Sequence, residues 1–202
     1  MILTEFPNSF PDFIASNPDL IVDLSFTDGI VDLVTEKTDV AIRMGNLPDS
    51  ALIARKLGQS RRVVCAAPGY LVRRGAPETP ADLERHDCLT FNFRRARPSW
   101  PFRCEGRDIA QPVKGSIVVN KGETMKQMVL AGAGIARVGL FHVADEITPG
   151  QLIPLLEDQN PGDLELVHAV YVGGGPLPHR VRAFTEHMVA ILADQPLLKG
   201  TS

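Results

Sequence analysis

Several kinds of signal are missing from this chain, and each absence removes a class of function. The basic excess that is typical of nucleic-acid binding is missing, because the formal net charge is -3 and the sequence pI is about 5.9. Long apolar runs are missing too, since no stretch approaches the roughly 20 residues that span a bilayer. The amino terminus has an acidic residue and prolines where a secretory signal has a basic start. We therefore expect a cytoplasmic protein, and we do not expect these residues to bind DNA themselves.

Cysteine is scarce, and its spacing matches no known type of site. Cys65, Cys88 and Cys104 form no CxxC pair, so neither a disulfide framework nor a zinc site is indicated. The histidines form no HExxH motif, and no serine lies in a GxSxG turn. His86 and Cys88 would share one face of a strand, but a buried cysteine beside a solvated histidine is the favoured interpretation. We predict no catalytic residues, no metal and no cofactor.

The glycines do not form a phosphate-binding loop. Gly132, Gly134 and Gly139 lie after a helical pattern and around a strand, which is the reverse of the strand, glycines and helix order that such a loop requires. Gly132 is better interpreted as the residue that ends a helix.

The chain does have the composition of a globular protein. Its 202 residues, 44% of them hydrophobic, suffice for one large domain or two small lobes. Strand and helix patterns alternate almost throughout with no low-complexity linker, which predicts an α/β architecture with mostly parallel sheets. The expected strands are 21–26, 40–42, 52–57, 63–67, 88–93, 116–119, 135–138 and 164–172. The expected helices are 10–16, 31–36, 80–85, 123–131 and 141–147, and one that begins at Pro178.

The segment VDLVTEKTDVAIRMG, residues 31–45, is the most informative part of the sequence. It predicts a helix, a tight turn and a buried strand that stops at Arg43 and Gly45. The carboxyl ends of strands in open α/β sheets bind small molecules, so a cation and a glycine there indicate the rim of a pocket. The alternative is that Arg43 only solvates the end of a strand.

Three further places indicate binding. Residues 120–124 open a helix after a strand, with Asn120 as the expected cap, so their free amides favour an anion. Phe91 and Asn92 alternate on a strand and offer an aromatic wall or a polar contact. Thr27 ends its own strand and offers a hydroxyl group.

Four segments together resemble a known family. NPDLIVDLSFTDGIVDLVTEKTDVAIRMG, LIARKLGQSRRVVCAAPGYLVRRGAPETPADLERHDCL, LAGAGIA and GQLIPLL follow one another as in the effector-binding domain of LysR-type transcriptional regulators. The resemblance implies a two-lobed fold like that of type 2 periplasmic binding proteins, with mixed, mostly parallel sheets, crossover strands and a small-molecule effector in the inter-lobe cleft. It implies that residues 1–61 and 169–202 form lobe I and that residues 62–168 form lobe II. The cleft residues are then expected to be Thr27, Arg43, Gly45, Phe91, Asn92, Asn120, Thr124 and Phe141.

The resemblance also implies partners. Copies are expected to form dimers or tetramers, with helix 10–16 of one copy against helix 123–131 of another, and an anionic effector fits Arg43 and the Asn120 helix end. DNA would be bound only through a winged helix-turn-helix, which these residues do not include. The first strand of lobe I is also expected to be missing, and its loss would expose unpaired edges and favour self-association or a weakened lobe.

Two other functions remain open from the sequence. A solute-binding protein of the same fold would need an export signal or a lipid anchor. A small hydrolase would use Cys88 and His86.

Overall fold

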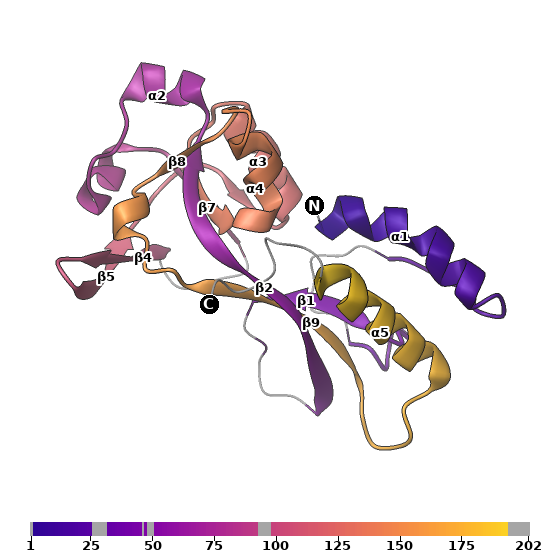
Figure 1. Ribbon diagram of the computed structural model, residues 1–202. Helices are drawn as coiled ribbons and strands as arrows, with labels where there is room; N and C mark the ends of the chain where they lie inside the picture. The colour runs from indigo at the N-terminus through magenta and orange to yellow at the C-terminus, as the bar shows by residue number, and fades with distance from the viewer. Residues whose placement is uncertain (1, 26–31, 46, 48–50, 93–97, 194–202) are drawn as a thin grey trace. The chain divides into compact units, whose positions relative to one another are not determined.

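The computed structural model describes residues 2–25, 32–45, 47, 51–92 and 98–193, and it divides into two compact units (Figure 1). Unit 1 comprises Met1–Ser60 and Leu164–Ser202, and unit 2 comprises Arg61–Asp163. The chain passes from unit 1 to unit 2 within a single strand and returns between Asp163 and Leu164. No helix in the described part of the chain is long and apolar enough to cross a membrane.

The elements follow one another with strands and helices mixed, as predicted. Unit 1 holds α1 (Ile2–Ser16), β1 (Ala41–Met44), the first part of β2 (Leu52–Ala66), β9 (Leu164–Val172) and α5 (His179–Ala193). Unit 2 holds the rest of β2, the helices α2 (Pro68–Arg74), α3 (Gly122–Leu130) and α4 (Leu140–Ile147), and the 3-10 helices η1 (Pro80–Arg85) and η2 (Glu157–Gln159). Its other strands are β3 (Cys88–Phe91), β4 (Ser99–Cys104), β5 (Arg107–Pro112), β6 (Val118–Val119), β7 (Ile135–Gly139) and β8 (Ile153–Leu155).

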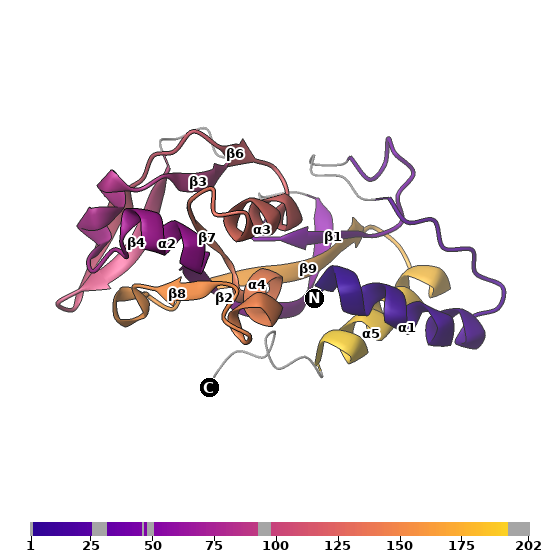
Figure 2. The ribbon, with the colours of Figure 1, turned by 90° about the horizontal axis from the view of Figure 1, so that it is seen from above.

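Unit 1 is a sheet in the order β1, β9, β2 with two helices beside it. β1 and β9 are antiparallel, and Arg43 lies opposite His168. Helices α1 and α5 lie side by side (Figure 2), where the ring of Phe13 meets that of Phe184 edge-on with centroids 6.1 Å apart. Phe13 is 3% exposed, so this helix pair supplies much of the core of the unit.

Two predictions for unit 1 are wrong. Residues 20–25 form no strand, and Ile21 is 98% exposed, because no described strand pairs with this segment to satisfy its backbone. The helix expected over residues 31–36 is reduced, in its described part, to turns after Asp32. The Asp32 carboxylate accepts the backbone N–H groups of Val34 at 3.0 Å and Thr35 at 3.4 Å, which satisfies the donors of a single turn.

Unit 2 is a mixed sheet in the order β8, β2, β7, β3, β6, together with the separate hairpin of β4 and β5. β2 is antiparallel to β7 and β8, whereas β3 is parallel to both β6 and β7. Side chains of β2 alternate between two cores. Val63 and Cys65 join the core under α3 and α4, while Val64 and Ala66 join the core that contains Trp100 of β4. The α/β architecture predicted from the sequence is confirmed.

Local signals placed some element ends correctly and missed others. Thr79 and Asp82 form the capping box of η1, and hydrogen bonds from Thr79 lower the pKa of Asp82 to about 2. Gly132 has a φ of 73°, and its N–H donates to the Val129 carbonyl, so it ends α3 as predicted. Strands 52–57 and 63–67 are instead one strand, β2, and strand β5 was not foreseen because its sequence RDIAQP shows no apolar alternation.

Candidate functional site

Three neighbouring parallel strands of unit 2 place their carboxyl ends at one edge, which we call the carboxyl edge. β3 ends at Phe91, followed by Asn92, and β6 ends at Val119, followed by Asn120. The Asn92 N–H donates to the Val119 carbonyl at 2.9 Å, so these two strand ends adjoin. Asn92 and Asn120 are exposed and Phe91 is half-buried. The carboxyl edge thus offers a ring and two side-chain amides to a ligand.

Two helices begin at the same edge. β6 leads into α3 and β7 leads directly into α4, so the amino termini of both helices lie where the parallel strands end. Gly122, the first residue of α3, packs on the His142 ring of α4, and a Cβ at this glycine would lie 2.3 Å from His142 Cε1. Free backbone N–H groups and the helix dipoles make this edge favourable for negative charge.

The start of α3 differs from the prediction in one respect. The residue that caps α3 is Lys121 and not Asn120, and no side chain makes the capping hydrogen bond. Because the backbone of Lys121 is extended, the helix begins at Gly122, one residue later than a cap at Asn120 would place it. Thr124 lies half-buried in the first turn of α3, while Asn120 is exposed just before it.

Phe141 lies inside unit 2. Its side chain is 1% exposed, and its ring centroid lies 4.1 Å from that of His142. In this position Phe141 supports the carboxyl edge from behind, and its contact with an effector stays a prediction.

His142 is a member of the edge that sequence reasoning missed. Burial lowers the pKa of His142 to about 4, so the imidazole is neutral at physiological pH. The only sequence signal was a glycine at the first position of the α3 helix, where a larger residue would displace the ring.

A salt bridge holds the two helices together behind the edge. Lys126 of α3 lies 3.0 Å from Glu123 and 3.3 Å from Glu146 of α4. Burial disfavours the charge of Lys126, but its hydrogen bonds to both carboxylates prevail and raise its pKa. The salt bridge therefore ties α3 to the last turn of α4.

Because burial lowers the pKa of His142, we expect the stability of the fold to depend on pH. Because the folded pKa of about 4 is below the unfolded value of 6.5, stability is full above pH 6.5 and is lost as the pH falls toward 4. We expect a loss on the order of 2–3 kcal/mol between pH 7 and pH 4, measured by urea unfolding at each pH. His142→Gln should remove most of this difference, whereas an equal loss in that variant would contradict the assignment.

Unit 1 carries its candidate residues at the end of β1. Arg43 is half-buried, and Gly45 has a φ of 85° with its N–H donated to the Leu166 carbonyl at 2.8 Å. The backbone of Gly45 is in the left-handed region, which explains why a glycine follows this strand. Thr27 lies outside the described residues.

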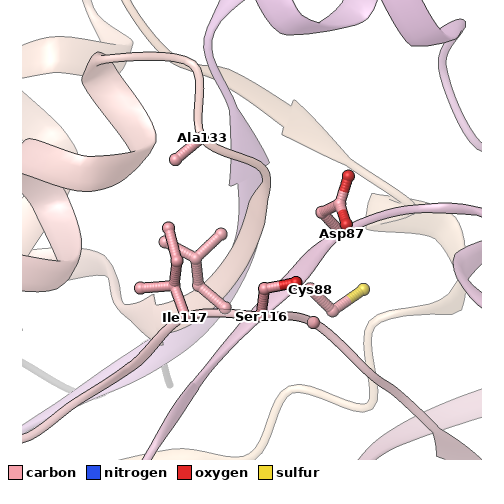
Figure 3. Close-up of a pocket in the computed structure, with 7 residues that line it drawn as sticks. Asp87, Cys88, Ser116, Ile117 and Ala133 are labelled. Atoms are coloured by element: carbon pink, nitrogen blue, oxygen red, sulfur yellow. The ribbon is translucent and has the colours of Figure 1, made fainter.

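A hollow in unit 2 lies at the opposite end of the same strands (Figure 3). It has a volume of about 200 Å³, and its walls come from the beginning of β3, the approach to β6 and the loop before β7. Its lining residues are Asp87, Cys88, Leu89, Gly115, Ser116, Ile117 and Ala133. None of the predicted binding residues lies there. We favour the carboxyl edge as the candidate site because Phe91, Asn92 and Asn120 lie there with the amino termini of α3 and α4.

Cys88 and His86 each have a different hydrogen-bond partner. Cys88 Sγ faces the Leu83 carbonyl at 3.7 Å, and burial raises the pKa of this thiol to about 12. His86 Nδ1 lies 3.1 Å from the hydroxyl of Tyr70, which also accepts the Asp87 N–H at 3.0 Å. These contacts favour the structural interpretation of both residues, because a protonated thiol is a poor nucleophile.

Comparisons with a family model and with known proteins indicate the same family. The LysR substrate binding domain matches residues 3–193. The HTH-type transcriptional regulator CrgA of Neisseria meningitidis serogroup C (strain 8013) is 32% identical over 177 residues, which are 88% of this chain and 59% of CrgA. The HTH-type transcriptional activator AaeR of Escherichia coli (strain K12) is 36% identical over 178 residues, which are 86% of this chain and 57% of AaeR. The chain thus spans less than two thirds of the length of these relatives.

A solved structure gives the same result for the fold. The regulatory domain of CrgA from Neisseria meningitidis matches with a TM-score of 0.84 at 30% identity, over 95% of this chain and 94% of that domain. The type 2 periplasmic-binding-protein-like fold that the sequence resemblance implied is therefore confirmed.

Proposed function

This chain belongs to the LysR substrate-binding domain family, and we propose that it senses a small-molecule effector for a transcriptional regulator. The observation that carries the proposal is the carboxyl edge of unit 2, where Phe91, Asn92 and Asn120 meet the amino termini of two helices. In α/β sheets this edge is where ligands bind. Arg43 and Gly45, at the end of β1 in unit 1, are also proposed to contact an effector.

The proposed mechanism is a shift of equilibrium without catalysis. An effector that binds one arrangement of the regulator more tightly than another favours that arrangement, and an attached DNA-binding domain then responds. The effector must bind the two arrangements with different affinities, since equal affinities shift nothing. Transcription control, DNA binding through a helix-turn-helix and a cytoplasmic location are part of this proposal, and they draw on the relatives that are transcriptional regulators.

Self-association is also proposed. Copies would pair through α1 of one and α3 of another, and each helix presents a partly exposed apolar side chain that a partner would cover. These are Ile14, 38% exposed, and Met128, 37% exposed. A solute-binding role of the same fold is less well supported, because the matching relatives named above are regulators.

The experiment is a search for ligands that raise the melting temperature of the domain. A stabilising ligand should have its calorimetric affinity lowered about tenfold or more by Arg43→Ala, as expected for the loss of a charge-assisted contact. Arg103→Ala is the matched control, since Arg103 is exposed in unit 2 and paired with Asp108 at 2.8 Å. Unchanged affinity in Arg43→Ala would exclude the proposed role of Arg43. A complete library without a stabilising ligand would count against the function itself.

A further inference from the structure

The register of β1 and β9 brings two nitrogen-rich side chains together. Arg43 lies directly opposite His168, and cross-strand partners project from the same face of a sheet with their Cβ atoms about 5 Å apart. Both side chains are half-buried. The neighbouring residues of β9, Val167 and Ala169, project to the other face and are fully buried. On β9, the face that carries His168 is thus more open at this point than the face of Val167 and Ala169.

One ring nitrogen of His168 has no hydrogen-bond partner in the part of the chain that the structure describes. This nitrogen, Nδ1, is buried. A buried polar atom without a partner costs free energy, and such atoms in native proteins mark places where a ligand or water completes the site.

A third basic group acts on the same histidine from the other neighbouring strand. Burial and the charge of Lys56 on β2 lower the pKa of His168. Lys56 is exposed and its Nζ donates to Gln59 Oε1. β9 is flanked by β1 and β2, so Arg43 lies on one strand that adjoins His168 and Lys56 lies on the other.

We infer that Arg43, His168 and Lys56 form an anion-binding face of unit 1 that holds a carboxylate. This inference rests on the proposed function, because it names the chemical class of the effector. Two permanent cations attract a carboxylate, and the imidazole supplies a hydrogen bond. The guanidinium of Arg43 suits a carboxylate because its N–H groups match both oxygens.

The imidazole of His168 makes the affinity for an anion depend on pH. A bound carboxylate offsets the positive charges near His168 and favours the protonated ring, so binding takes up protons when the pH lies near the pKa of the free histidine. By linkage, the affinity for the anion rises as the pH falls. A site made of Arg43 and Lys56 alone would show no such rise between pH 8 and pH 6.

The experiment is a titration of the whole 202-residue chain with sodium benzoate, followed by NMR of the His168 ring. Benzamide, which has the same ring without the charge, is the matched neutral probe, and acetate and inorganic phosphate test smaller anions. We expect benzoate to shift the His168 resonances, to raise its measured pKa, and to bind about threefold or more tightly at pH 6 than at pH 8. Benzamide should do none of these.

Variants separate recognition from folding. Arg43→Gln and Lys56→Gln should each weaken benzoate binding several-fold, and His168→Gln should abolish its pH dependence while the melting temperature stays near that of the wild type. Arg182→Gln, which removes an exposed cation from α5 in the same unit, is the control and should leave binding unchanged.

Two results would overturn the inference. One is the absence of any His168 shift with benzoate, acetate or phosphate, and the other is an equal shift with benzamide. The proposed function is tested separately. If an uncharged effector binds and protects the backbone amides of Asn92 and Asn120 from exchange, the proposed function is supported and only the anion-binding face is contradicted. If anions bind at His168 but no ligand in the library stabilises the domain, the anion-binding face is supported and the proposed function is contradicted.

Discussion

Phe141→Ala should lower the free energy of unfolding by about 3–5 kcal/mol, which is the usual cost of removing a buried aromatic ring. Phe141 is 1% exposed and its ring lies against His142, so the truncation leaves a cavity behind the carboxyl edge. The adjoining start of α4 would lose its support, and effector affinity should fall as well. Urea unfolding, with calorimetry for the affinity, measures both effects.

Phe141→Leu is the matched control because it keeps most of the apolar volume. We expect it to cost less than about 1.5 kcal/mol and to leave effector affinity nearly unchanged. If Phe141 contacts the effector directly, the leucine variant should instead lose affinity at normal stability, and the interior role assigned to Phe141 would then be wrong.

Gly134→Ala should be the other severe substitution, at about 3 kcal/mol or more. A Cβ at Gly134 would lie 2.1 Å from the Asp87 carbonyl oxygen and 2.5 Å from Leu89 Cδ1. The same oxygen accepts the Ile135 N–H at 2.9 Å, so the alanine must push β7 away from β3 at a point where the two strands are hydrogen-bonded. Thermal unfolding and amide exchange of Ile135 measure the damage.

Gly175→Ala provides the control for this prediction. A Cβ at Gly175 has no atom within 4 Å, so the change should stay within about 0.5 kcal/mol. Equal stability of the two alanine variants would show that β3 and β7 tolerate separation at Gly134.

The sequence predicted best the elements whose signals are local. The strand over 164–172 is found as β9 with the same bounds, and the capping residues at Thr79 and Gly132 do what their types indicate. The strand over residues 21–26 has an equally apolar pattern, yet its described residues are not a strand. Strand formation depends on a neighbouring strand to pair with, and a pattern along one segment cannot report whether that neighbour is present.

For the candidate site, the sequence identified the strand ends and missed what lies beside them. Arg43, Phe91 and Asn120 follow from the rule that ligands meet the carboxyl ends of strands, and the structure places each at or next to such an end. His142 and His168 were not identified, because their surroundings are set by other elements: Gly122 lies against the His142 ring, and Arg43 is the cross-strand partner of His168.

The sequence by itself determined the family, the α/β class and the segments that hold candidate residues, because each depends on residue types at fixed spacing along the chain. Tertiary structure alone decided which residues meet. It placed Phe91, Asn92 and Asn120 beside two helix amino termini, moved Phe141 into the core, and set His168 opposite Arg43. The physical reason is that burial and strand register are properties of pairs of segments, and a single segment carries no record of its partner.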